Sequence, residues 1–401
     1  MSAQDIWIIG ASMTPFGRFA DKDLIDLAAD AALGALSDAQ VSMGDVGVLA
    51  LGNVYEANSH NGQRLQKQIG QTGIPVFNVV NACATGATAA RVAMLAIAAG
   101  EADIGLAVGV EKMGKMGMIG GSARPREEKK VYAASGRYGS VVRPEGILGT
   151  GTMPGVFAQA GMEYAFQHGV TQTHFAKVAQ KNHAHSVLNP LAQYRKEFSL
   201  DEILHAEVIS YPNTLPMCCP TGDGAAAVVL VSDAKLKTLG LDVRRRAVKI
   251  SAAVMTSDPW TETDQVQPDV NTLTRLAADR AYEQAGIGPE DLDLVELHDC
   301  FATAELLHYD NLRLCESGGA GAFIDSGAPW RNGKIPVNVS GGLLSKGHPL
   351  GATGIANLFE VTAHLRGEAG DRQIEGARVG LTHVIGLASA CAVHILEASS
   401  R

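Results

Sequence analysis

The sequence predicts an α/β fold made of two similar halves, with a subdomain inserted into the first half. Short apolar runs typical of strands alternate with alanine-rich runs typical of helices over most of the 401 residues. Three short segments of the first half recur in the same order in the second half. The alternation breaks between about residues 114 and 207, and this stretch is too long to be a plain loop.

The expected elements divide the chain into three units. The first half opens with a strand at 6–10, contains a strand at 104–108, and regains a strand at 225–231 after the insertion. The second half opens with a strand at 249–254 and runs to the end of the chain. We expect an N-terminal half at 1–118 and 206–246, an inserted loop subdomain at 119–205, and a C-terminal half at 247–401.

The internal matches indicate which segments are equivalent in the two halves. Three pairs of segments match, namely 27–32 with 276–281, 45–49 with 291–295, and 86–88 with 351–353. A chance similarity of alanine-rich runs could explain one match, but three in the same order favour a duplication. If a pseudo-twofold axis relates the halves, the turns before 86–88 and 351–353 face each other.

Cys83 stands in the first of these two turns. A run at 74–80 predicts a buried strand before it, and an alanine-rich run at 89–99 predicts a helix after it. A cysteine at a helix N-terminus lies near unpaired backbone N–H groups and the positive end of the helix dipole, which favour the thiolate. The pattern predicts a nucleophile for covalent acyl transfer, although a lone cysteine is more often a small buried hydrophobe.

The second turn holds His348 within a glycine-rich run at 341–354, and Pro349 suits the first turn of a helix. A third segment is a strand that starts at Leu294 and ends in His298-Asp299-Cys300. Each histidine alone is more often an ordinary polar residue. Together with Cys83 they occupy strand ends and strand-to-helix turns, where α/β proteins place their chemistry. Cys83, His298, Cys300 and His348 are therefore the candidate catalytic residues.

Composition excludes several classes of function. The net charge of −9 and the shortness of the basic runs argue against a nucleic-acid partner. The six cysteines lack the spacing of a disulfide framework or a zinc ribbon, and the pair His183 and His185 lacks further ligands, so we expect no metal site. No apolar stretch reaches about 18 residues and the start shows no signal-peptide pattern, so we expect a cytoplasmic protein without membrane insertion.

At the level of motifs, the chain resembles the thiolase superfamily, and within it the sterol-carrier-protein type of thiolase. The resemblance covers nearly the whole chain. The element His298-Asp299-Cys300-Phe301 is the most discriminating, since most other thiolases resemble Asn-Glu-Ala-Phe there and carry their second cysteine near the C-terminus. The matching stretches are 14–19, the turn around Cys83, 109–113, 182–190, 219–227, 298–301 and 341–354.

The resemblance implies two stacked halves in a five-layered αβαβα arrangement and a thiolase reaction, either thiolysis of 3-ketoacyl-CoA or the reverse Claisen condensation. It implies that Cys83 carries the acyl group, that His348 accepts the thiol proton and with His298 holds the enolate oxygen, and that Cys300 is the second acid/base. The backbone N–H groups of Cys83 and Gly386 are the expected oxyanion donors. The reaction fits the degradation of fatty acids or sterol side chains.

The resemblance further implies that coenzyme A and acyl-CoA are substrates rather than cofactors, and that the chain forms a homodimer or tetramer. Ser345, Arg124 and Arg126 are candidate contacts to substrate. Asp299 could act on substrate or merely stabilise its loop. Since four residues follow Glu397, no sterol-carrier domain is expected.

Two other functions stay open. One is a decarboxylating ketosynthase, to whose chemistry Cys300 would be superfluous. The other is a condensing or scaffold subunit that works with a small OB-fold partner, or a degenerate relative whose fold serves binding or aldol cleavage. The presence of both Cys83 and Cys300 argues against a degenerate relative.

Overall fold

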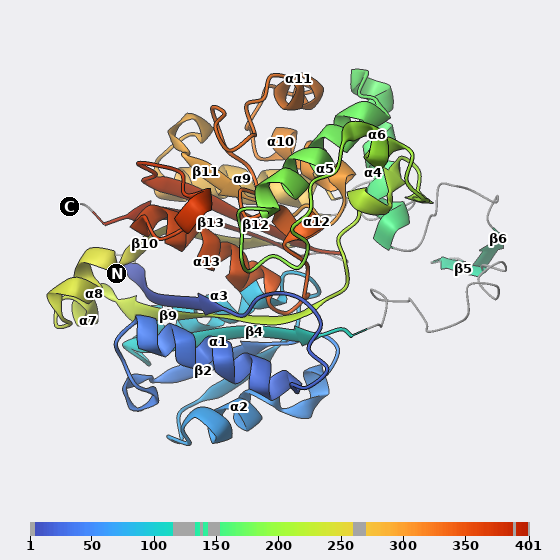
Figure 1. Ribbon diagram of the computed structural model, residues 1–401. Helices are drawn as coiled ribbons and strands as arrows, with labels where there is room; N and C mark the ends of the chain where they lie inside the picture. Colours follow the sequence, from blue (N-terminus) through green and yellow to red (C-terminus); the bar gives the residue numbers. More distant parts are fainter. Residues whose placement is uncertain are drawn as a thin grey trace.

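A nine-stranded mixed sheet forms the centre of the protein (Figure 1). The computed structural model describes residues 5–114, 133–136, 139–142, 153–259, 270–387 and 390–399. The strand order is β11-β12-β13-β10-β1-β9-β4-β2-β3. Only two residue pairs, Trp7 with Lys249 and Ile8 with Val248, join β1 to β10. The sheet is therefore two groups of strands linked by one short antiparallel pairing.

The two groups repeat one topology. In the first, β2 pairs in parallel with β4, which continues antiparallel to β9 and β1; in the second, β11, β12, β13 and β10 pair in the same way. The strands of the first group are β1 (Ile6–Met13), β2 (Val48–Gly52), β3 (Val76–Val79), β4 (Ile104–Lys112) and β9 (Asp223–Ser232). Those of the second are β10 (Val248–Thr256), β11 (Leu294–Glu296), β12 (Val379–Gly386) and β13 (Ala390–Ala398).

The matched segments fall on equivalent elements. The 27–32 and 276–281 runs lie in α1 (Leu24–Asp38) and α9 (Thr272–Ala285), and the glycine motifs lie at the starts of α3 (Thr85–Ala98) and α13 (Thr353–Arg366). Both latter helices are followed by a glycine with positive φ, Gly100 and Gly367. The predicted duplication is confirmed.

Helices and strands stack in five layers, as the resemblance implied (Figure 1). Helix α1 and α2 (Asn61–Ile69) cover the outer face of the first strand group, and α9 and α10 (Ala302–Asn311) lie beyond the second group. Helices α3 and α13 form the middle layer and contact each other; α3 lies against strands of the first group, and α13 contacts strands of both groups. A Cβ at Gly86 would lie 2.6 Å from the carbonyl oxygen of Gly351, so only glycine allows the two helix starts to approach this closely.

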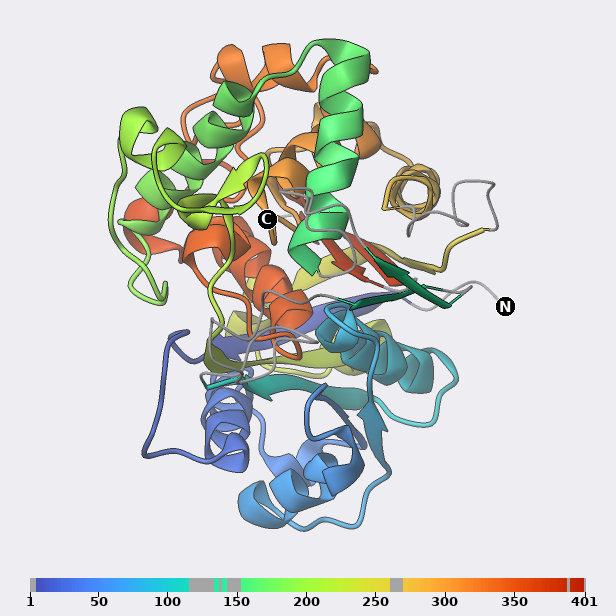
Figure 2. The same ribbon diagram turned by 90° about the vertical axis from the view of Figure 1, so that its right-hand side faces the viewer.

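The inserted segment covers the second half (Figure 2). Its helices α4 (Met153–His168) and α5 (Gln172–Ser186) lie against α10, and α5 also contacts α11 (Ala320–Asp325) and α12 (Gly342–Ser345). The remaining elements are short: β5 (Ala133–Gly136), β6 (Gly139–Val142), α6 (Leu200–Leu204), β7 (Val208–Ser210), β8 (Asn213–Thr214), α7 (Asp233–Leu236) and α8 (Leu241–Arg246).

One strand differs from the expectation. The run at 74–80 was expected to be a buried strand, but β3 lies at the edge of the sheet, and Phe77 and Val80 are 42% and 57% exposed. An apolar run predicts a strand without indicating whether the sheet continues beyond it.

In the part of the chain described here, every helix is too short or too polar to cross a bilayer.

Candidate active site

Three of the predicted side chains meet between the two halves. Cys83 precedes α3, His298 follows β11, and His348 precedes α13, and all three are buried. The Cys83 Sγ atom and one ring nitrogen of each histidine lie within 4.8 Å of one another. The two imidazole rings are nearly perpendicular, with centroids 5.2 Å apart. The topology therefore joins residues that are more than 200 positions apart in the sequence.

The backbone before α3 holds Cys83 in a tight turn. Ala82 has a φ of 46°, in the left-handed region that a non-glycine residue seldom adopts. The Thr85 hydroxyl closes the turn by accepting the N–H of Asn81 at 2.7 Å and donating to the Ala82 carbonyl at 2.6 Å. Backbone strain of this kind persists where the surroundings hold it in place, and it often marks functional sites.

The thiol of Cys83 differs from the expectation. We expected a depressed pKa from the helix dipole, but burial raises the pKa of Cys83 to about 12, and the nearby Glu111 carboxylate adds to the effect. The backbone N–H groups of Cys83 and Leu387 oppose this shift by bonding to the sulfur. The prediction was wrong because the inserted segment and the second half exclude water from the turn. This shift favours the neutral thiol of Cys83 in the free protein.

His348 is held as a proton acceptor. Thr353 Oγ1 donates its one proton to the Pro349 carbonyl at 2.9 Å, so it accepts from the Nδ1–H of His348 at 2.7 Å. This tautomer leaves the Nε2 lone pair free, and among the described residues Nε2 has no hydrogen-bond partner. Burial, with a smaller contribution from the nearby Lys346, lowers the pKa of His348 to about 3. A neutral imidazole beside a neutral thiol can take its proton during attack.

His298 has no ring partner in the part of the chain that the structure describes. Both of its nitrogens are buried and unbonded there, whereas its backbone N–H donates to Nδ1 of His383 at 3.3 Å. Burial, with His348 next, lowers the pKa of His298 well below the usual range. An unsatisfied buried polar group costs about 1–3 kcal/mol. An oxygen of a bound substrate would remove that cost, which marks the place for a developing negative charge.

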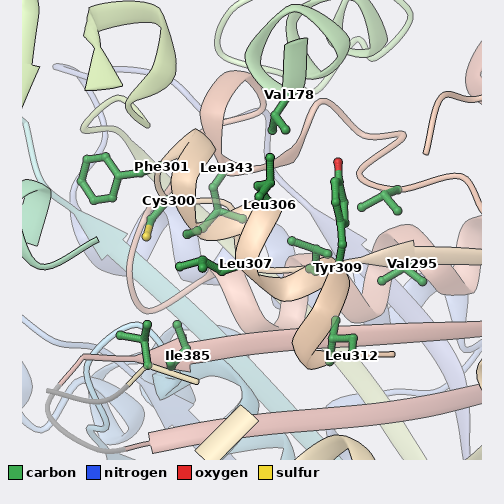
Figure 3. Close-up of a cluster of buried hydrophobic side chains, with 14 of the residues drawn as sticks. Val178, Val295, Cys300, Phe301, Leu306, Leu307, Tyr309, Leu312, Leu343 and Ile385 are labelled. Atoms are coloured by element: carbon green, nitrogen blue, oxygen red, sulfur yellow. The ribbon is translucent and has the colours of Figure 1, made fainter. Parts of the chain in front are cut away.

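Cys300 lies in the hydrophobic cluster that Figure 3 draws, with Phe301, Leu307 and Leu343. Burial raises the pKa of its thiol, and the thiols of Cys219 and Cys83 contribute. Cys219 donates its backbone N–H to the Cys300 carbonyl at 3.0 Å. Cys219 had no role in the prediction, although the motif at 219–227 already pointed to that segment.

The other predicted contacts are placed differently. Ser345 is buried, and its hydroxyl bonds to Ser186 Oγ at 2.7 Å and to the Tyr194 carbonyl at 3.0 Å, so it ties its turn to the inserted segment. Its role as a substrate contact stays a prediction. Arg124 and Arg126 lie outside the described residues. A Cβ at Gly386 would lie 2.5 Å from the carbonyl oxygen of Asn81, so the end of β12 approaches the Cys83 turn.

Glu111 was not singled out as functional. Its buried carboxylate accepts from Val54 N at 3.0 Å, Tyr55 N at 3.2 Å and Gly351 N at 3.1 Å, and thus connects the loop after β2 to the turn before α13. Burial raises the pKa of Glu111 to about 7. A charged residue at the end of the apolar run at 104–110 was the available signal.

One thiol and two imidazoles could also hold a thiophilic cation, since a cysteine with two histidines and an open fourth position is a ligand set used by zinc. The same atoms match the needs of acyl transfer, namely a nucleophile, its base and a donor for an oxyanion. The expectation of no metal stays a prediction.

Two family models match successive parts of the chain. The N-terminal thiolase domain model matches residues 6–204, and the model described as thiolase C-terminal domain-like matches residues 259–398. Sterol carrier protein 2 of Bos taurus is 41% identical over 98% of this chain and 72% of its own length. The acetyl-CoA acetyltransferase of Methanothermobacter thermautotrophicus is 34% identical over 98% of this chain and 100% of its own.

Among solved structures, an Ltp2-ChsH2(DUF35) aldolase shares the fold with a TM-score of 0.80. The alignment covers 99% of this chain and 98% of that chain at 22% identity.

Proposed function

The chain belongs to the thiolase family and is an acyltransferase, and from this premise we propose that it cleaves 3-ketoacyl-CoA thioesters with coenzyme A, or runs the reverse Claisen condensation, through an acyl group on Cys83. The observation that carries the proposal is the meeting of Cys83 Sγ, His298 and His348 within 4.8 Å. In the part of the chain described, both histidines have ring nitrogens without a hydrogen-bond partner, and these nitrogens are available to accept the thiol proton and to bind an oxygen of the substrate.

In the first half-reaction, Cys83 Sγ attacks the 3-keto carbon of the substrate while its proton passes to Nε2 of His348. The tetrahedral oxyanion is held by backbone N–H groups, for which Cys83 and Gly386 remain the candidates. Loss of one such donor typically costs about 3 kcal/mol of transition-state stabilisation. The bond between carbons 2 and 3 then breaks, the oxygen of the enolate is held by His298 and His348, and Cys300 protonates the carbon to give acetyl-CoA.

In the second half-reaction, Cys300 takes the thiol proton of coenzyme A, and the resulting thiolate attacks the acyl group on Cys83. Collapse of this intermediate gives the shortened acyl-CoA, and Cys83 regains its proton from His348. The full cycle consumes one 3-ketoacyl-CoA and one coenzyme A and returns the enzyme unchanged.

Coenzyme A and acyl-CoA are substrates in this proposal. The relative named sterol carrier protein 2 supports a lipid-derived acyl chain, from a fatty acid or a sterol side chain. The exposed edge of β3 supports a homodimer, or a tetramer built from it, because an unpaired strand edge invites another chain. All six cysteines are free, which supports a reducing cytoplasmic compartment.

A condensing or scaffold role with a small OB-fold partner is the alternative. The fold shared with the Ltp2-ChsH2(DUF35) aldolase is compatible with it, and the two buried cysteines of the site favour the thiolase reaction instead. Activity of the chain without any partner would decide between them.

Thiolysis of acetoacetyl-CoA and of longer 3-ketoacyl-CoA thioesters, followed with added coenzyme A, tests the proposal. We expect wild type to form two acyl-CoA products and Cys83→Ala to form none, with Cys315→Ala as a matched cysteine control outside the site. A Cys83→Ala protein as active as the Cys315→Ala control would overturn the proposal.

A further inference from the structure

Asp299 lies between two of the proposed catalytic residues, yet its carboxylate is fully occupied by protein groups. Oδ1 accepts the backbone N–H of Leu343 at 2.6 Å. Oδ2 accepts the N–H of Leu344 at 3.2 Å and the side-chain amide of Asn182 at 2.7 Å. The side chain is completely buried. One carboxylate thus connects the segment 298–300 both to the turn that leads to His348 and to α5 of the insertion.

A second buried carboxylate continues the connection. Glu305 Oε2 accepts from the amide of Asn182 at 2.6 Å and from that of Asn338 at 2.8 Å. Its Oε1 lies 2.8 Å from Nζ of Lys181, which also donates to the Val337 carbonyl at 2.7 Å. Lys181, Asn182, Asp299 and Glu305 are all 0% exposed. The amide of Asn182 therefore bridges two carboxylates, and the ammonium group of Lys181 pairs with one of them, that of Glu305.

The backbone around this network is adapted to it. Gly342 has a φ of 58°, and a Cβ there would collide with the Asp299 carboxylate, so the turn leaves room for the carboxylate only because residue 342 is glycine. A buried polar network is expensive unless each member is bonded, and here each carboxylate oxygen has at least one donor. Such an arrangement keeps a unique geometry rather than merely filling space.

We propose that Asp299, together with Asn182 and the Glu305–Lys181 pair, is a positioning residue that holds His298 and Cys300 in register with His348. The inference rests on the proposed function. Asp299 touches no reacting atom; it acts through the three residues whose loops its carboxylate joins. Because α5 supplies Lys181 and Asn182, the inserted segment takes part in the alignment of the catalytic loops.

The positioning role predicts that two partial reactions, acetylation of Cys83 and exchange of the α-protons of acetyl-CoA, lose different amounts of rate in the variants. Acylation of Cys83 by acetyl-CoA needs Cys83, His348 and the oxyanion donors; Cys300 assists only by protonating the departing coenzyme A, and a thiolate can also leave without that proton. Exchange of the α-protons of acetyl-CoA also needs His298 and Cys300 in register. A misplacement of about 1 Å can cost on the order of 10²-fold in rate. We expect Asp299→Asn and Asn182→Ala to lower α-proton exchange by about that factor while acetylation of Cys83 stays much closer to wild type.

The matched control is Glu360→Gln. This change likewise replaces a buried carboxylate by an amide, here one that bonds to Arg372 through both oxygens, but the site lies outside the catalytic loops. The α-proton exchange is followed by NMR in deuterated water, and acetylation of Cys83 is followed by intact mass. The Tm is measured for all variants. We expect Glu360→Gln to lower Tm without this difference between the two partial reactions.

Several outcomes would overturn the inference. It fails if exchange in Asp299→Asn equals that of the Glu360→Gln control, or if both partial reactions fall in proportion to the loss of Tm. If Asp299→Asn is insoluble, Asn182→Ala serves as the test, because it keeps the Asp299 carboxylate and removes one of its donors. Wild-type α-proton exchange in Asn182→Ala would contradict the positioning role of Asp299. Failure of the proposed function is distinct, since wild type itself would then show neither acetylation nor exchange.

Discussion

Mild acid should remove a large part of the folding free energy, because the native protein buries histidines that cannot take up a proton. Burial lowers the pKa of six fully or almost fully buried histidines. The pKa falls to about 3 for His185, His308 and His348 and to about 4 for His394. It falls well below the usual range for His298 and His383.

The magnitude follows from proton linkage. Since these pKa values lie below the ordinary value of 6.5, their stabilisation is complete above pH 6.5 and is lost as the pH falls. Asp299 and Glu111 act in the opposite direction, because burial raises the pKa of both carboxyls. Unfolding near pH 5.5 should therefore take up about four protons net. Each proton contributes about 1.4 kcal/mol per pH unit, so the free energy of unfolding should fall by roughly 5 kcal/mol for each pH unit. The total free energy of unfolding of a typical protein is only about 5–15 kcal/mol.

Urea unfolding followed by circular dichroism at pH 7.5, 6.5 and 5.5 measures this slope. His308→Gln should reduce the slope by about one proton, whereas His205→Gln should leave it unchanged because the side chain of His205 is 77% exposed. A free energy of unfolding that stays constant from pH 7.5 to 5.5 would refute the reasoning, as would equal slopes for the two variants.

Four further outcomes are expected. Cys300→Ala should still allow slow acylation of Cys83 by a reactive acyl-CoA, but the rate of the carbon–carbon step should fall by about 10² to 10⁴, and wild-type α-proton exchange in it would move the acid/base role elsewhere. The rate of Cys83 alkylation by iodoacetamide should rise with pH without a plateau up to about pH 9, because burial raises the pKa of its thiol to about 12; a plateau near neutral pH would contradict this burial effect. Gly86→Ala should lower Tm by several degrees and reduce activity, since its Cβ would meet the Gly351 carbonyl at 2.6 Å, whereas Gly240→Ala, with open space around it, should not; equal Tm values would contradict the close packing. Dialysis against EDTA should leave thiolysis unchanged, and stoichiometric zinc that leaves together with activity would favour a metal site at Cys83.

The duplicated architecture could be predicted because it depends on local patterns. Alternating apolar runs predicted the strands at 6–10, 104–108, 225–231 and 249–254, and each is part of an observed strand. The exposure of β3 could not be predicted in the same way. Whether a strand lies inside or at the edge of a sheet depends on pairing between distant segments, which no local pattern of 74–80 records.

In the candidate site, too, local features could be predicted from the sequence, whereas contacts between distant segments could not. Glycines, a cysteine and histidines at strand-to-helix turns pointed to Cys83, His298 and His348, and the topology brings them together. The pKa of Cys83 was misjudged because a helix N-terminus is a local feature, while the burial that outweighs it comes from other parts of the chain. The bonds from Asn182 to Asp299 and Glu305 join residues more than 100 positions apart, so nothing in the local sequence announces them.

Transfer of an acyl group to Cys83 is the central claim, and intact mass spectrometry after brief mixing with acetoacetyl-CoA tests it most directly. The account predicts a mass increase of one acetyl group, located on Cys83 by peptide mapping, absent from Cys83→Ala, and removed by added coenzyme A. A protein that stays unmodified, or that carries the acetyl group on Cys219 or Cys300 instead, would contradict it.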